Sequence, residues 1–307
     1  MSFNEKDLQR ALAMRIGMQI AVSSLPVVEE KMDIDLDRFI DSVPLPPEVP
    51  SGTAIDVEVS VASDLSRMRW SAFGHPAGFI PKLADYLNRA GVLPVDIALI
   101  NGMGDAIQPN LVGMWIGISA GTVRTGWQFR ERRAVAELQP FLGNEFGVAK
   151  LMAWVARRDV DFYRAFVRSI GAEPTSRVEV ALPGDPAAQV DLAAAAFQDL
   201  LGRELPAAVR DAIGGAAAPE TALAFDLAGG DLRGLAVSAD ALGDDVIDAL
   251  CRGLNLPRDA GHNGIVKALK ADGVARVEYR HAGGVDAVDL TYLPGEVEGE
   301  SPPPGRN

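Results

Sequence analysis

The amino-acid sequence predicts an α+β fold in which ten antiparallel strands form a barrel with helices outside. Apolar and polar residues alternate in five strand–turn–strand pairs, and helical sequence separates these pairs. The pairs recur roughly every 55 residues, as expected of repeated structural units. Each strand has one apolar face that helices must cover, and closure into a barrel removes the sheet edges. An open α+β sheet is the alternative arrangement.

The N-terminal half is predicted from local patterns. Apolar residues at helical spacing predict helices over 4–22, 27–42 and 78–90, the second ended by the prolines of VPLPPEVP. Alternation over AIDVEVSVASDLSRMRWSAF predicts a hairpin at 55–73, and residues rich in Val, Ile, Trp and Phe predict another at 111–130. The apolar run VDIALI, at 95–100, is interpreted as a strand.

The C-terminal half continues the pattern. Helices are predicted over 134–170, with a break at GNEFG, and over 194–213 and 241–256. Hairpins are predicted at 176–193, 222–238 and 274–293, the last two turning on Gly-Gly pairs. The segment 264–273 is ambiguous between helix and strand. We therefore expect one domain over 1–293 and a disordered tail over 294–307, which is poor in apolar residues.

Composition excludes several classes of protein. The 307 residues carry a formal net charge of −13, which disfavours nucleic acid and anionic membranes as partners. The single cysteine, Cys251, allows no intramolecular disulfide, and its apolar helical setting favours a buried structural thiol. The N-terminus lacks a signal-peptide pattern, and no apolar run is long enough to span a membrane. We expect a cytoplasmic protein.

Arginines recur on the polar faces of the predicted hairpins, although the chain is acidic. Every hairpin contributes at least one: Arg67, Arg69, Arg124, Arg177, Arg233, Arg276 and Arg280. If the polar faces line a lumen, these side chains converge and form an anion site. If they face bulk water, they are an ordinary solvated surface. The recurrence in every hairpin favours the lumen.

One acidic motif, DDVID, places Asp244, Asp245 and Asp248 in a pattern that isoprenyl diphosphate synthases use to bind magnesium. It stands alone, without a second acidic motif. Aspartates are also favoured in the first turn of a helix by its dipole. We therefore predict no metal site in the protein. Magnesium remains a candidate counter-ion of a bound diphosphate, although no clear motif encodes it.

The element order over residues 5–293 resembles the ABBA prenyltransferases, which have αββα units around a ten-stranded barrel. The cyanobactin-type peptide prenyltransferases are the most similar group. DVEVSVASDLSRMRW resembles their first hairpin, with a glutamate followed by a basic second strand. SIGAEPTSRVEVALPG resembles their helix-to-strand passage, and ARVEYRHAGGVDAVDLTYL resembles their last strands, which end in tyrosine.

This resemblance implies transfer of a dimethylallyl or geranyl group from an allylic diphosphate to a peptide side chain or an aromatic small molecule. It implies that Glu58 is the general base and that Arg67 or Arg69 binds diphosphate. Arg276 and Tyr292 fall near late-strand active-site positions of the family. The roles of Arg124, Arg177, Arg233 and Arg280 are inferred from their strand faces, and Trp127 and Phe225 are candidates with Tyr292 for the prenyl and acceptor pocket.

Two features depart from the family and keep other functions open. The chain has only four tyrosines to wall an allylic cation, and few lysines. A degenerate enzyme, a non-catalytic β-rich binding or assembly protein, and a different enzyme on an open sheet are the alternatives. Convergence of Glu58, Arg67, Arg177 and Arg276 in one cavity would argue against a binding protein.

Overall fold

A computed structural model describes residues 54–60, 66–89, 93–119, 122–142, 146–160, 162–170, 174–215, 221–256, 258, 271 and 273–293. At 54–60, 66–73, 82, 86–87, 89, 114, 116–119 and 122–125 this description covers the backbone only. The helices predicted over 4–22 and 27–42, the segment 264–270 and the tail 294–307 lie outside the described residues.

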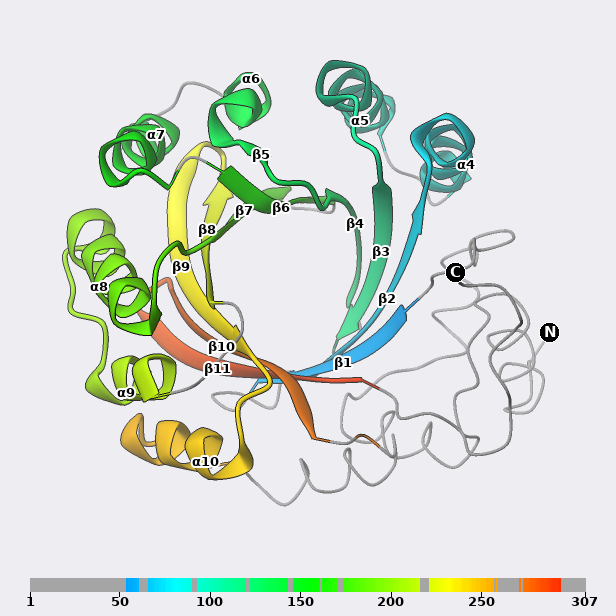
Figure 1. Cartoon of the computed structure of the whole chain (residues 1–307). Helices are drawn as coiled ribbons and strands as arrows, with labels where there is room; N and C mark the ends of the chain where they lie inside the picture. The colour runs from blue at the N-terminus through cyan, green and yellow to red at the C-terminus, as the bar shows by residue number, and fades with distance from the viewer. Residues whose placement is uncertain are drawn as a thin grey trace, which may run out of the picture.

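The strands form one antiparallel sheet that curves into a barrel-like shape (Figure 1). They are β1 (Ala54–Ser60), β2 (Ser66–Gly74), β3 (Val112–Ser119), β4 (Thr122–Phe129), β5 (Arg133–Ala134), β6 (Phe162–Ile170), β7 (Thr175–Ala181), β8 (Thr221–Ala228), β9 (Asp231–Asp240), β10 (Val274–Ala282) and β11 (Val285–Tyr292). Their order is β4-β3-β2-β1-β11-β10-β9-β8-β7-β6-β5, and β4 also pairs with β6. The described sheet has eleven strands rather than ten, because the two-residue β5 pairs with β6.

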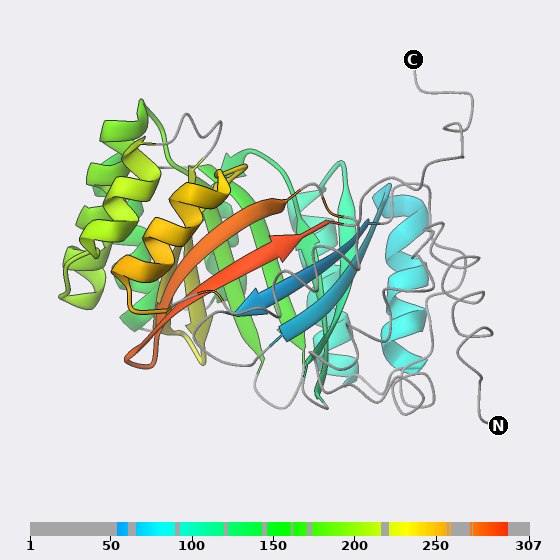
Figure 2. The ribbon, with the colours of Figure 1, turned by 90° about the horizontal axis from the view of Figure 1, so that it is seen from below.

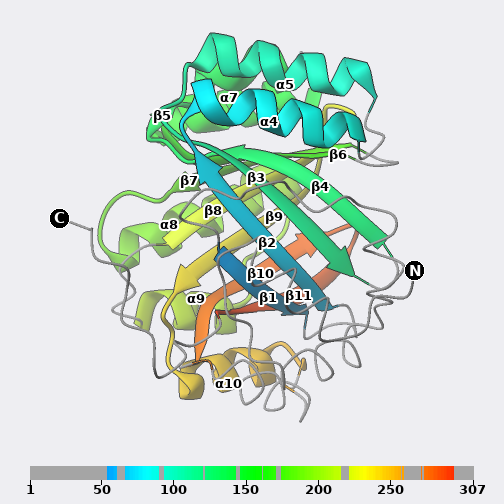
Figure 3. The same ribbon diagram turned by 90° about the vertical axis from the view of Figure 1, so that its right-hand side faces the viewer.

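Helices surround the outside of this sheet in Figure 1, as the sequence predicts. They are α4 (Pro76–Arg89), α5 (Pro94–Ile107), η1 (Val135–Leu138), α6 (Gln139–Leu142), α7 (Phe146–Arg158), α8 (Pro186–Ala196), the π-helical turn η2 (Phe197–Leu201), α9 (Ala207–Gly215) and α10 (Asp244–Gly253). Turned views show α8, α9 and α10 on one side and α4 and α5 on the other (Figures 2 and 3). None of the described helices is both long and apolar enough to cross a membrane.

The core lies between the sheet and these helices, because alternate residues of each strand point to opposite faces. Leu223 and Phe225 of β8 are fully buried on the helix-covered face. Asp226, the next residue after Phe225, lies on the inner face, where its partner across the ladder is Arg177 of β7. The α+β barrel-like architecture predicted from alternation is therefore confirmed. The hairpins β1–β2, β3–β4, β8–β9 and β10–β11 also match predicted ones.

Two predicted strands are helical instead. The run at 95–100 belongs to α5, which begins at Pro94 and buries Ile100, Met103 and Ile107 at helical spacing. The proposed strand at 188–193 belongs to α8, where Asp185 caps the helix by accepting a hydrogen bond from the backbone N–H of Ala188. Both short apolar runs are compatible with a strand or a helix. A proline in the first turn of each helix favours the helix.

One predicted helix contains a strand. The helical prediction over 134–170 is wrong from Phe162 onward, where β6 pairs with both β4 and β7. A register shift between Tyr163 and Ala165 interrupts the alternation of apolar and polar residues at this point. The partner of β7 in the third hairpin is therefore β6, which precedes it.

A polar cluster ties the outer face of β10 and β11 to the end of η2. The Asp286 carboxylate accepts two hydrogen bonds from Arg203, at 2.9 and 3.2 Å, and one from the Tyr279 hydroxyl at 2.9 Å. His281 Nδ1 lies 2.6 Å from the same carboxylate. Burial alone would raise the pKa of Asp286, but bonds from His281, Arg203 and Tyr279 outweigh it and lower the pKa.

We expect Asp286→Asn to lower the free energy of unfolding at pH 7 by about 1–2 kcal/mol, because the carboxylate is partly exposed and accepts several hydrogen bonds. The stabilisation exists above the usual carboxyl pKa of 3.8 and is lost as pH falls through the lower folded value. Urea unfolding of both proteins at pH 7 and pH 3 measures this. An equal difference at both pH values would contradict the assignment to the ionised carboxylate.

Candidate functional site

Charged side chains and one serine gather on the inner face of β6 to β11, the face opposite the helices. This inner-face cluster consists of Arg164, Arg177, Glu179, Asp226, Ser238, Asp240, Arg276, Glu278, Arg280 and Asp289. The strand register brings them together, since Glu278 pairs across the ladders with both Ser238 and Asp289. The cluster therefore brings together Arg177, Arg276 and Arg280, three of the predicted arginines.

Glu179 of β7 lies at the centre of the cluster. Its carboxylate is 2.9 Å from Arg276 Nη2 and 3.0 Å from Arg164 Nε, and the residue is 8% exposed. Burial alone would raise the pKa of Glu179, but the surrounding arginines outweigh it, so the pKa falls below its usual value. The carboxylate is therefore ionised and held in place by two strands at once.

Arg177 extends from β7 toward β10. It donates a hydrogen bond to the Glu278 carboxylate and lies 3.4 Å from Asp226. Burial would lower the pKa of Arg177, but these carboxylates raise it well above its usual value. Arg177 therefore stays charged within the barrel.

Small residues on the intervening strands make room for these contacts. The contacts of Arg177 with Glu278 and of Glu179 with Arg276 run from β7 to β10 and pass over β8 and β9. The inner-face positions there include Ala222, Ala224 and Ala236. Longer side chains at these positions would fill the space in which the charged groups meet.

A tryptophan lies on the other wall of the barrel. Trp115 of β3 pairs across the ladder with Gly126 of β4, and it is 5% exposed. A Cβ atom added at Gly126 would come within 2.6 Å of the indole. Glycine at this position therefore lets the ring approach the backbone of β4 closely, on the inner face. In the sequence, the signal for this placement is that Trp115 shares one strand face with Gly113 and Gly117.

Four predicted site residues, Glu58, Arg67, Arg69 and Arg124, are described by their backbone only. The register places Glu58 of β1 opposite Arg67 of β2 and Thr291 of β11. Thr291 in turn lies opposite Arg276 of β10. Arg69 and Arg124 both lie opposite Gly117. By register, these four positions share the face that carries the inner-face cluster. The predicted convergence of Glu58 and Arg67 with Arg177 and Arg276 remains a prediction.

Four other site predictions need correction. Arg233 lies near the end of the β8–β9 hairpin with its side chain 64% exposed, 3.5 Å from Asp231, and does not join the cluster. Trp127, Phe225 and Tyr292 are fully buried in the core against the helices. Trp127 contacts Phe129 and Phe166, and Phe225 contacts Trp154 of α7. The period of two places these three aromatic residues on the face opposite the arginines.

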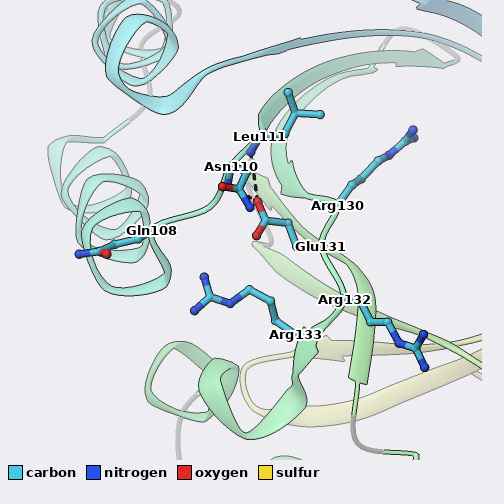
Figure 4. A pocket seen from close by; sticks show the side chains of 7 residues that line it. All are labelled: Gln108, Asn110, Leu111, Arg130, Glu131, Arg132 and Arg133. Carbon is cyan, nitrogen blue, oxygen red and sulfur yellow. Dashed lines mark hydrogen bonds between the residues drawn. The ribbon is translucent and has the colours of Figure 1, made fainter.

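A separate pocket of about 500 Å³ opens between α5, β4 and β5 (Figure 4). Its lining residues are Gln108, Asn110, Leu111, Arg130, Glu131, Arg132 and Arg133. Glu131 accepts hydrogen bonds from the backbone of Asn110 and Leu111, and Arg133 is 2.7 Å from Glu137. The three arginines point in different directions in Figure 4, so they do not converge on one ligand position.

The aspartates of the DDVID motif and Cys251 lie on α10, where two of the aspartates form ion pairs and the thiol is buried. Asp244 and Asp248 each lie 2.9 Å from Arg258, and Asp244 is in the first turn of the helix. Burial raises the pKa of the Cys251 thiol to about 11. Among the described residues, no group of three or more His, Cys, Asp and Glu side chains is placed to hold a metal ion.

Comparison of the sequence with known proteins gives one partial match. No family model matches the chain. The chain is 30% identical over 190 residues to a PH domain-containing protein of Dictyostelium discoideum, and the match covers 58% of this chain and 40% of that protein. The chain thus spans less than half the length of this curated relative.

Comparison of the structure gives matches over nearly the whole chain. NotF, a prenyltransferase solved with brevianamide F and DMSPP, matches with a TM-score of 0.65 and 11% identity over 97% of each chain. AnaPT from Neosartorya fischeri matches with a TM-score of 0.62 and 10% identity over 94% of this chain and 99% of AnaPT. The prenyltransferase PriB, solved with L-tryptophan and dimethylallyl thiolodiphosphate, matches with a TM-score of 0.56 and 12% identity over 89% of this chain and 95% of PriB. This chain has the fold of the ABBA-type prenyltransferases.

Proposed function

We propose that the chain transfers a prenyl group from an allylic diphosphate to an electron-rich acceptor. The inner-face cluster carries this proposal, because it gathers partly buried arginines inside a barrel-like fold that prenyltransferases share. The pairing of β4 with β6 and of β1 with β11 supports a closed ring of the ten longer strands. Such a ring would enclose the reaction and exclude water from it.

Arg177 and Arg276 would bind the diphosphate of the donor. Both remain charged, since neighbouring carboxylates outweigh the effect of burial on their pKa values. Ionisation breaks the bond between C1 of the prenyl group and the diphosphate oxygen, and negative charge develops on the leaving group. Guanidinium groups already fixed in a buried site stabilise that charge without reorganising.

The acceptor then forms a bond to the allylic carbon and loses a proton. Trp115 is the proposed aromatic wall for the cation, since it lies on the inner face. Glu58, by its family resemblance and its register position, is the proposed base for the proton. We further propose a dimethylallyl or geranyl donor, and a peptide side chain or aromatic small molecule as acceptor, the peptide by resemblance to the cyanobactin-type enzymes.

A magnesium site held by the protein does not fit the cluster. Glu179, Asp226 and Glu278 are each engaged by an arginine, so their oxygens are not arranged as a ligand set. Magnesium is proposed only as a counter-ion that enters with the diphosphate, and no step above depends on it.

A non-catalytic binding or assembly protein is the second candidate. One observation favours it: Arg177, Arg276 and Arg280 all have carboxylate partners within the protein. A network balanced in this way can simply fix the fold. The two candidates differ in whether the cluster binds an allylic diphosphate.

Calorimetric titration with the thiolo analogues of dimethylallyl and geranyl diphosphate, with and without magnesium, tests the donor site. We expect binding that weakens about 10- to 100-fold in Arg276→Ala, because charge-assisted hydrogen bonds are lost. Arg233→Ala is the matched control, since this arginine is exposed and outside the cluster. No binding heat with either donor would overturn the proposal and favour the binding protein.

A further inference from the structure

The arginines proposed to bind the diphosphate already hold carboxylates. Arg276 Nη2 lies 2.9 Å from Glu179 Oε2 and donates a hydrogen bond to Ser238 Oγ at 2.6 Å. Arg177 contacts Glu278 and Asp226. A diphosphate that binds these guanidinium groups therefore competes with the protein's own carboxylates for the same N–H donors.

The charge within the cluster makes this competition costly. Its described members comprise four arginines (Arg164, Arg177, Arg276 and Arg280) and five carboxylates (Glu179, Asp226, Asp240, Glu278 and Asp289). A diphosphate adds several negative charges to this nearly balanced set. Since the site is largely buried, repulsion between like charges is screened less than at the surface. Uptake of a proton by a carboxylate would relieve it.

Glu179 is the carboxylate that we expect a bound diphosphate to repel most. It is 8% exposed, and Arg276 and Arg164 contact its two oxygens from β10 and β6. The other charged groups around it are Arg177 on its own strand, Asp226 of β8, Asp240 of β9 and Glu278 of β10. If Arg276 turns to the diphosphate, Glu179 keeps Arg164 but gains a polyanion as neighbour. A buried carboxylate in that position is stabilised by protonation.

We propose that binding of the donor diphosphate displaces Glu179 from Arg276 and is coupled to the uptake of a proton by Glu179. This inference rests on the proposed function. The inner-face carboxylates then act as counter-ions of the arginines before the donor binds, and the diphosphate takes their place. Release of diphosphate after the reaction returns Arg276 to Glu179, which gives up the proton. Donor affinity consequently rises as pH falls from 7.5 to 6.

Calorimetry in paired buffers of low and high ionisation enthalpy, such as PIPES and imidazole, measures the protons taken up when the dimethylallyl thiolodiphosphate analogue binds. We expect the observed heat to depend on the buffer, with net uptake that increases from pH 7.5 to pH 6. In Glu179→Gln we expect less uptake and donor binding at least as tight as in the wild type. The difference between the two proteins removes any contribution from protonation of the analogue itself.

Glu137→Gln is the matched control, since Glu137 forms an ion pair of 2.7 Å with Arg133 outside the cluster. It should leave the proton uptake unchanged. Binding with buffer-independent heat in the wild type, or equal uptake in Glu179→Gln and the wild type, would overturn the inference and leave the proposed function standing. Complete absence of donor binding would overturn both. If Glu179→Gln unfolds, Glu278→Gln tests the same exchange at Arg177.

Discussion

Replacing Trp127 by alanine is expected to lower the free energy of unfolding by about 3–5 kcal/mol. Trp127 is 0% exposed, and its ring centroid lies 5.1 Å from that of Phe129 and 5.6 Å from that of Phe166. It faces the helices, so its removal leaves a cavity between the sheet and the helices rather than a wider reaction lumen. Urea unfolding followed by circular dichroism measures the loss.

Phe146→Ala is the control, because this aromatic residue at the start of α7 is 81% exposed and should contribute little. Titration of Trp127→Ala with the donor analogue distinguishes a core role of Trp127 from a role in the pocket. Replacing a core residue lowers the free energy of unfolding. Replacing a pocket residue weakens donor binding and leaves the free energy of unfolding unchanged. The second result for Trp127→Ala would contradict its assignment to the core and restore the prediction made from the sequence.

The hairpins were predictable because their signals are local. Strand alternation depends only on neighbouring residues, and the turns at 229–230 and 283–284 need backbone with positive φ. Gly229 and Gly230 have φ of 58° and 79°, and Gly283 and Gly284 have φ of 60° and 82°. Because glycine adopts these angles without strain, Gly-Gly between two alternating runs predicted both hairpins correctly.

The failed elements show where local patterns are ambiguous. In β6, the register shift near Tyr163 and Ala165 brings apolar side chains next to one another along the chain, and a run of that kind also fits a helix. In α8, Asp185 followed by Pro186 is a good helix start, but the same pair also fits a turn. Pairing with β4 and β7 makes the first segment a strand, and the Asp185 cap together with Pro186 starts a helix in the second.

The candidate site was predictable as a face but not as a set of contacts. Alternation placed Arg177 and Arg276 on the polar side of their strands. The same alternation separates Trp127 from Gln128, so it could have excluded Trp127 from the lumen. The pairing of Arg177 with Glu278 spans 101 residues of sequence and depends on the curvature of the sheet and on the alanines between β7 and β10. No local pattern contains that information.

Replacing Arg276 by methionine is expected to cost about 3–5 kcal/mol of unfolding free energy at pH 7, because it leaves Glu179 as a buried charge with one partner fewer. The double variant Arg276→Met/Glu179→Gln should recover about 1–3 kcal/mol of this loss, since the uncompensated charge is gone. Urea unfolding of the wild type, both single variants and the double variant gives the coupling free energy. Independent, additive effects would contradict a direct pair.

The pH dependence separates the ion pair from packing. In the wild type the pKa of Glu179 is below the usual 4.5, so its stabilisation is complete above that pH and is lost as pH falls through the folded value. Without Arg276, burial dominates and Glu179 protonates at a higher pH than in the wild type. The destabilisation by Arg276→Met should therefore be largest near pH 7 and smaller at pH 4. A loss independent of pH would assign it to the packing of the arginine side chain, and Arg276 would then be a structural residue whose effect on donor binding is indirect.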